Sequence, residues 1–192
     1  MGGYYDVDAI LCEEERVPCV FAIDAVGVGM LDPTSSEDDI AQGTKVEFPL
    51  WMAEKLAAKR MVNVELPKHY ADRFREQLAA GPAAVNLRER SQFYYEVGGA
   101  LARLVGDRGL GDKLLEVFSG ERFKRLLEHS LNSRGEDVAA FTRTLPALER
   151  ALFDAGYEAS EAYVQWKTRR QGRLAESKVL RGKKRKKRPR ES

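Results

Sequence analysis

The chain has 192 residues, of which 43% are hydrophobic and 32% are charged. It is therefore long enough to bury a core, and its composition excludes a protein that is disordered throughout or embedded in a membrane. No apolar run reaches the roughly 18 residues that a spanning helix needs. The first residues lack the basic and then apolar pattern of a secretory signal, so we expect an intracellular protein.

The charge is distributed unevenly. The formal net charge of +2 includes a block from Arg181 to Arg190 in which eight of ten residues are basic. Without residues 181–192, the chain has 24 basic and 29 acidic residues. A protein that binds DNA through its folded surface usually has a basic body, which is the opposite distribution. The sequence thus predicts an acidic folded body followed by a basic, disordered tail from residue 178 to residue 192.

The first 66 residues predict a small β-rich domain. A short helix is expected over residues 6–14, and strands are expected over 17–23, 45–48 and 61–66, from their alternation of apolar and polar residues. Pro49 is placed to open a helix over residues 50–60. Residues 34–42 are polar and acidic, which is typical of an exposed loop.

From residue 67 to residue 177 the pattern predicts a helical bundle, so the fold class is α+β, mainly α. Helices are expected over residues 67–80, 91–105 and 112–131, separated by glycines, with Leu115, Phe118, Leu126 and Leu127 facing inward. A fourth helix begins near residue 136. Its apolar residues are spaced by three and four and form a stripe, in which Pro146 predicts a kink or restart with Thr144 as the new cap. The stripe consists of Val138, Phe141, Leu145, Leu148, Leu152, Ala155 and Ala159.

No familiar catalytic, metal or cofactor pattern is found. The two cysteines, Cys12 and Cys19, have neither zinc nor redox spacing, and His69 and His129 have no second ligand at a suitable distance in sequence. A phosphate-binding loop and a complete dinucleotide fingerprint are both missing. The sequence therefore predicts a protein that is not an enzyme and has no catalytic residue, metal or cofactor.

Aromatic and apolar residues in the helical part are the candidates for contact with partner subunits. Most aromatics are expected in the core, but neighbouring aromatics such as Phe93 and Tyr94 do not all point the same way, and Trp and Tyr are favoured interface anchors. The candidate subunit-interface residues are Phe93, Tyr94, Val138, Phe141, Leu145, Leu148, Leu152, Tyr163 and Trp166.

The dense basic block is the second candidate site. It fits the acidic grooves of nuclear import receptors or the phosphates of nucleic acids, and its alternative interpretation is a functionally silent, solubilising terminus. The candidate nuclear localisation residues are Lys183, Lys184, Arg185, Lys186, Lys187 and Arg188.

Several stretches together resemble one family, the Psf-three subunits of the GINS complex. The resemblance rests on residues 5–11 (YDVDAIL), 17–19 (VPC), 43–53 (GTKVEFPLWMA), 64–70 (VELPKHY), 86–87 (NL) and 93–98 (FYYEVG), and more loosely on 148–153 and 166–167. It covers nearly the whole chain apart from the acidic loop and the tail, and it is weakest over residues 106–147.

The resemblance implies a non-catalytic subunit. GINS subunits carry a helical A domain and a small β-rich B domain, and in this subunit the B domain comes first. The family's function implies a heterotetramer with the three other GINS subunits. That assembly joins the MCM hexamer and the Cdc-forty-five protein in the replicative helicase of the nucleus, the CMG complex. DNA contact would be indirect or weak, an import receptor would read the tail, and no membrane would be involved.

One alternative from another class stays open at this point. The chain could be a nuclear nucleic-acid-binding protein that acts through its basic tail, in which case binding would be indifferent to sequence and weakened by salt.

Overall fold

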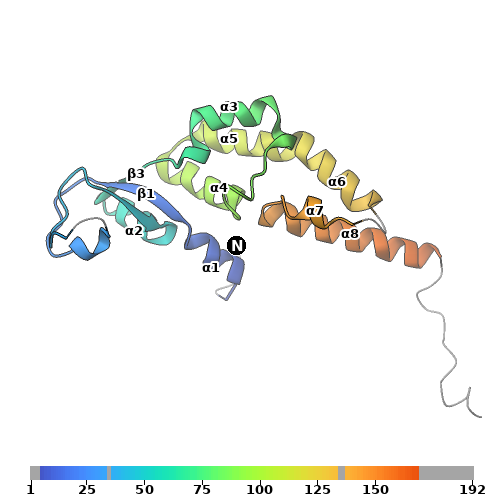
Figure 1. The fold of residues 1–192 in the computed structure, drawn as a ribbon, viewed down its shortest axis with the longest axis horizontal. Helices are drawn as coiled ribbons and strands as arrows, with labels where there is room; N and C mark the ends of the chain where they lie inside the picture. Colours follow the sequence, from blue (N-terminus) through green and yellow to red (C-terminus); the bar gives the residue numbers. More distant parts are fainter. Residues whose placement is uncertain (1–4, 34–35, 134–136, 169–192) are drawn as a thin grey trace, which may run out of the picture.

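The structure is a computed structural model, and it describes residues 5–33, 36–133 and 137–168. Within these residues a three-stranded antiparallel sheet near the N-terminus is followed by helices, which confirms the α+β, mainly α class. The sheet lies at one end of an elongated molecule, helices α3 to α5 lie in the middle, and α6 to α8 form the other end (Figure 1). The longer elements are α1 (Val7–Glu13), β1 (Arg16–Phe21), β2 (Lys45–Pro49), α2 (Leu50–Ala58), β3 (Val62–Val64), α3 (Asp72–Ala80), α4 (Tyr94–Val105), α5 (Arg108–Val117), α6 (Phe123–Asn132), α7 (Ala139–Thr142) and α8 (Ala147–Lys167).

The sheet follows from the alternation in its strands. β1 lies in the centre, with β2 and β3 as antiparallel neighbours. Val17, Cys19 and Phe21 point from β1 into the core, and Phe48 of β2 meets Phe21 edge to face. The period of two places one face of each strand inside and the other outside, so the predicted strands and the helix after Pro49 are confirmed.

A long loop connects β1 to β2 and is held by hydrogen bonds along its own length. Gly27 donates its backbone N–H to Asp39, and Gln42 donates its own to Asp24. A Cβ atom on Gly29 would lie 1.8 Å from the carbonyl oxygen of Glu37, so this crossing requires glycine. In the segment 34–42, which was expected to be exposed, Glu37, Asp38 and Asp39 are exposed but Ile40 is buried, and Asp32 earlier in the loop is buried as well.

The helical part departs from the sequence-based expectation at three places. The helix predicted from residue 67 begins only at Asp72, because Lys68–Tyr70 forms a separate 3-10 turn. Gly109 and Gly111 lie inside α5 rather than before it, since the carboxylate of Asp107 caps α5 by accepting the backbone N–H of Leu110. A capping aspartate outweighs the weak helix propensity of two glycines.

The helix predicted over residues 112–131 is also divided. A π-helical segment, Phe118–Arg122, joins α5 to α6, and Gly120 within it has a non-helical ψ of −132°. Of the four residues predicted to face inward, Leu126 is buried and Phe118 is half-buried against the core, whereas Leu115 and Leu127 are exposed.

One continuous hydrophobic core extends from the sheet to α5. It passes from β1 and α2 through Tyr70, Tyr94 and Leu101 to Leu114, and therefore crosses residue 66, where the boundary between two domains was predicted. Tyr70 and Tyr94 stack with ring centroids 4.8 Å apart and donate hydrogen bonds to backbone carbonyls. Trp51 of α2 is not part of this core and is 41% exposed.

Candidate subunit interface

Helices α6 and α8 form a pair with a small core of its own. Leu126, Leu145 and Phe153 are buried between them, and Phe141 and Tyr157 pack against this cluster. Gly156 of α8 lets the helices approach closely, because a Cβ atom there would lie 2.7 Å from the hydroxyl oxygen of Ser130. Pro146 is the N-cap residue of α8, so the predicted restart at this proline is present. Thr144 does not cap the helix, since its hydroxyl donates to the carbonyl of Phe141 instead.

A buried ion pair anchors the start of α8 to the rest of the molecule. Both oxygens of Glu149 accept from the guanidinium of Arg122, and Tyr95 of α4 donates its hydroxyl to the same carboxylate at 2.6 Å. Burial alone would lower the pKa of Arg122, but the hydrogen bonds and charge of Glu149 outweigh it and raise that pKa. Burial also raises the pKa of Tyr95, so its hydroxyl stays protonated and donates. The network fixes which face of α8 turns inward.

The side of α8 that faces away from this network carries an exposed stripe of apolar residues. Leu148, Leu152, Tyr163 and Trp166 are 36%, 38%, 58% and 70% exposed, and Ala155 and Ala159 between them are exposed as well. These six residues, which we call the α8 stripe, lie on one side of the helix, whereas Glu149, Phe153 and Gly156 lie on the neighbouring side against α6. From Leu148 to Trp166 the stripe extends over about 27 Å at 1.5 Å per residue.

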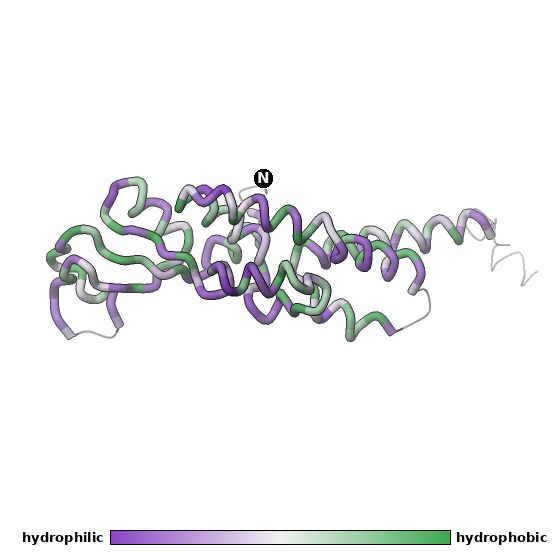
Figure 2. The backbone as a smooth tube through the Cα atoms, turned by 90° about the horizontal axis from the view of Figure 1, so that it is seen from above, coloured by the Kyte–Doolittle hydropathy of each residue, from purple (hydrophilic) through white to green (hydrophobic). Residues whose placement is uncertain are grey.

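Helix α6 adds a second uncovered row. Phe123, Leu127 and Leu131 are spaced by four residues and are 37%, 44% and 46% exposed. Apolar residues recur along both helices of this end in the view from above (Figure 2). Contiguous exposed apolar surface of this kind is characteristic of protein–protein interfaces.

The structure separates the sequence-predicted interface residues into two groups. Leu148, Leu152, Tyr163 and Trp166 are exposed, and Val138 and Phe141 are half-buried. The second group is buried in the chain's own core: the exposed fractions of Phe93, Tyr94 and Leu145 are only 4%, 1% and 4%. Sequence reasoning missed the α6 row, although its spacing of four residues was a usable signal.

The basic residues from Lys183 to Arg188 lie outside the residues that the structure describes. Within residues 5–33, 36–133 and 137–168, no three His, Cys, Asp or Glu side chains are grouped so as to hold a metal ion. The described helices include none long and apolar enough to cross a membrane. Cys19 is buried and Cys12 half-buried, and both are free thiols.

Comparison with known proteins identifies the family. Residues 5–58 match the model of the PSF3 N-terminal domain. The chain is 35% identical over 168 residues to a probable DNA replication complex GINS protein PSF3 of Dictyostelium discoideum, covering 88% of this chain and 63% of that protein. It is 34% identical over 180 residues to the DNA replication complex GINS protein PSF3 of Phaeosphaeria nodorum, covering 88% of this chain and 97% of the relative. The Homo sapiens protein of that name is 28% identical over 194 residues, covering 96% of this chain and 89% of the relative.

These relatives share one description, that of a protein of the GINS DNA replication complex. The chain belongs to the PSF3 family of GINS proteins.

Proposed function

We propose that the chain is a non-catalytic subunit of a heterotetrameric GINS complex and that the α8 stripe packs against sister subunits. The observation that carries this proposal is the row of four large apolar side chains, Leu148, Leu152, Tyr163 and Trp166, which α8 turns away from its own core. Covering such a row with a partner's apolar surface gains roughly 25 cal/mol per Å² removed from water. The names of the relatives support this choice of partners, because they describe proteins of a GINS DNA replication complex.

The wider role belongs to the same proposal. The assembled tetramer joins the MCM hexamer and the Cdc-forty-five protein, and this chain contributes structure to the replicative helicase while the ring hydrolyses ATP. The family resemblance supports this role. An exposed stripe and a core that continues from the sheet into the helices suit a rigid adaptor between larger proteins.

Native mass spectrometry of the chain co-expressed with three other GINS subunits tests the assembly. We expect one copy of each subunit in a single complex, and we expect Leu152→Asp to prevent it, because an unpaired charge buried in an apolar interface costs several kcal/mol. Glu158→Lys is the control, since Glu158 is exposed on α8 but is not part of the stripe. A chain that stays monomeric with all three partners, or a Leu152→Asp variant that assembles normally, would contradict the proposal.

Nuclear import through Lys183–Arg188 is a separate part of the proposal and has its own test. A dense cluster of basic side chains complements an acidic receptor groove. Deletion of residues 181–192 should reduce nuclear entry of a fluorescently tagged chain and leave assembly with the sister subunits unchanged. Entry that persists after the deletion would refute this role for the tail.

A further inference from the structure

A groove of about 550 Å³ lies between α1, α2, α4 and the first turns of α8. Part of its lining is apolar: Ala147, Leu148 and Ala151 of α8 are accessible, and behind them lie Leu50 and Phe93, which are only 2% and 4% exposed. Helix α1, which forms one side, contributes no buried residue to the described structure. The start of α8 lies close to α1, and α8 runs from there away from the sheet (Figure 1). The groove is therefore an open surface that α1 borders without filling.

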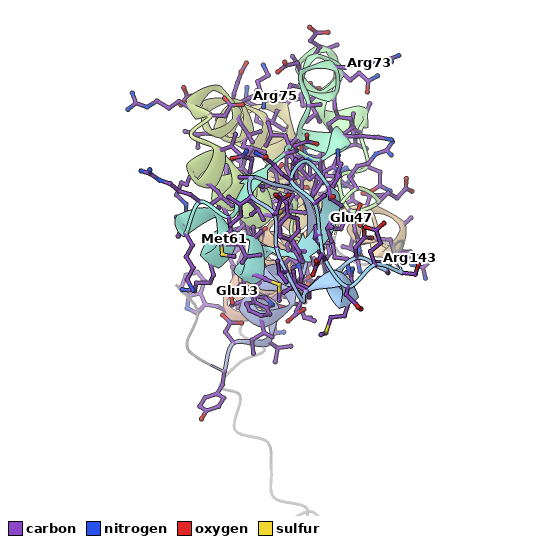
Figure 3. The ribbon with its side chains drawn as sticks, turned by 90° about the vertical axis from the view of Figure 1, so that its left-hand side faces the viewer. Glu13, Glu47, Met61, Arg73, Arg75 and Arg143 are labelled. Carbon is purple, nitrogen blue, oxygen red and sulfur yellow. The ribbon has the colours of Figure 1, made fainter. Side chains whose placement is uncertain are left out.

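The rim of this groove is strongly acidic. Its charged residues are Asp6, Asp8, Glu13, Glu54 and Glu96, with Arg103 as the single cation. Among the residues that the structure describes, none forms an ion pair with Asp8, Glu13, Glu54 or Glu96. Glu13 projects on the side of the molecule opposite to Arg73 and Arg75 of α3 (Figure 3).

The carboxylates that line the groove lie close enough to shift the pKa of two neighbouring groups. The pKa of Glu96 is raised by burial and further by Asp8, which faces it from α1. The pKa of the Cys12 thiol is raised to about 11, first by burial and then by the surrounding carboxylates, Glu96 foremost. A cationic ligand in the groove would relieve this repulsion between like charges.

The chain itself carries a segment with the complementary chemistry. Residues 178–188 read KVLRGKKRKKR, in which two adjacent apolar residues, Val179 and Leu180, precede the basic block. The apolar pair matches the apolar wall, and the lysine and arginine heads match the acidic rim, while their methylene stems are able to lie along apolar surface.

The segment is also long enough to reach the groove. Ala151 and Thr168 are 17 residues apart along α8, which corresponds to about 26 Å. The 11 residues from Thr168 to Val179 span at most roughly 36–40 Å when extended. The segment therefore reaches the α8 border of the groove when its tether is largely extended.

We propose that residues 178–188 dock into the groove between α1, α2, α4 and α8 of the same chain. While docked, the basic block is withheld from nucleic acids and from acidic receptors. The inference does not depend on subunit assembly, because Asp8, Glu96 and the tail lie outside the α8 stripe, and only Leu148 belongs to both surfaces.

Photo-crosslinking of the full chain tests the docking. The photoreactive residue p-benzoylphenylalanine replaces Leu180, and the cross-linked peptides are identified by mass spectrometry at low and high salt. We expect cross-links to α1, α2 and α4 within one chain, with a yield that is independent of protein concentration and falls as salt screens the charges. The double variant Asp8→Asn/Glu96→Gln should reduce the yield several-fold. Asp112→Asn/Glu121→Gln, which changes the charge equally at exposed positions outside the groove, should leave it unchanged.

Three results would overturn the proposal. Cross-links scattered over the surface would show a tail without a site. Cross-links that disappear on dilution would show that the segment binds a second copy or another protein. An equal loss of cross-link yield in the groove variant and in its control would show that the tail is attracted to the overall acidic charge of the body and does not dock at a specific site.

Discussion

Arg122 and Glu149 are joined by two parallel hydrogen bonds, Nε to Oε1 and Nη2 to Oε2, each 2.7 Å long. Their side chains are only 8% and 3% exposed, although 27 residues separate them in the chain. The remaining guanidinium nitrogen donates to the carbonyls of Pro82 and Val85, so one arginine connects α8, the π-helical segment and the loop before α4. The pair determines how α8 is rotated about its axis, and thereby which of its sides stays exposed.

Removing one member of this pair should be far more damaging than removing an exposed pair. Glu149→Ala leaves a buried guanidinium unpaired, and we expect a loss of about 3–5 kcal/mol in the free energy of unfolding. Asp154→Ala is the control, because its partner Arg150 and Asp154 itself are about half exposed, and such pairs contribute about 0–1 kcal/mol. Urea denaturation measures both. Similar losses in the two variants would mean that Arg122 finds water or another acceptor.

Two adjacent glycines in α4 should respond in opposite directions to the same substitution. A Cβ atom at Gly98 would lie 2.7 Å from both Leu114 and Tyr70, whereas one at Gly99 meets no atom within 4 Å. Gly98→Ala should therefore lower stability by about 1–3 kcal/mol through overpacking. Gly99→Ala should raise it by about 0.5–1 kcal/mol, because alanine favours the helix. Thermal unfolding of the two variants provides the measurement, and a stabilised Gly98→Ala protein would show that the α4–α5 contact is looser than described.

The sheet and α2 were predictable because their signals are local. Alternation in β1 and β2 and the proline before Leu50 each depend on residues a few positions apart. The Arg122–Glu149 pair was not predictable in this way, since a charged residue in a helix is normally solvated and nothing local links two residues 27 positions apart. Gly120 alone did not predict the break between α5 and α6, because a single glycine is often tolerated within a helix.

The α8 stripe shows a second limit of sequence reasoning. Periodicity found Leu148 and Leu152 on one side, but Phe153 and Tyr157 form another apolar row about 100° away. Periodicity alone does not reveal which row the chain covers itself. The buried Arg122–Glu149 pair and the close contact at Gly156 decide it, and both depend on the tertiary fold.

Neighbouring residues on α8 should therefore separate stability from assembly. Phe153 is 1% exposed, so Phe153→Ala should reduce the free energy of unfolding by about 3–5 kcal/mol. Leu152 is 38% exposed, and Leu152→Ala should cost the isolated chain less than about 1 kcal/mol while weakening its association with sister subunits. Denaturation and co-purification are measured for each variant. A Leu152→Ala protein that is destabilised as much as Phe153→Ala would show that the stripe belongs to the chain's own core.

The acid sensitivity of the fold should depend in part on Asp107. Its carboxylate accepts a hydrogen bond from Arg75 at 2.6 Å and caps α5 through the N–H of Leu110. The hydrogen bond from Arg75, followed by the one from Leu110, holds the pKa of Asp107 below its ordinary value. The folded state thus binds the proton less readily than the unfolded state. The resulting stability is present above the unfolded pKa of about 3.9 and is lost as the pH falls through the folded pKa.

Asp107→Asn should lower the free energy of unfolding by about 1–2 kcal/mol at pH 7, because a charge-assisted hydrogen bond is lost while asparagine can still cap the helix. The difference from the unaltered chain should shrink as the pH falls below about 4, where protonation removes the same charge from Asp107. Urea unfolding between pH 7 and pH 3 measures this convergence. Asp112→Asn, at an exposed position of α5, should run parallel to the unaltered chain over the whole range. If the Asp107→Asn curve also ran parallel, the stabilising contribution of Asp107 would not come from its ionised carboxylate.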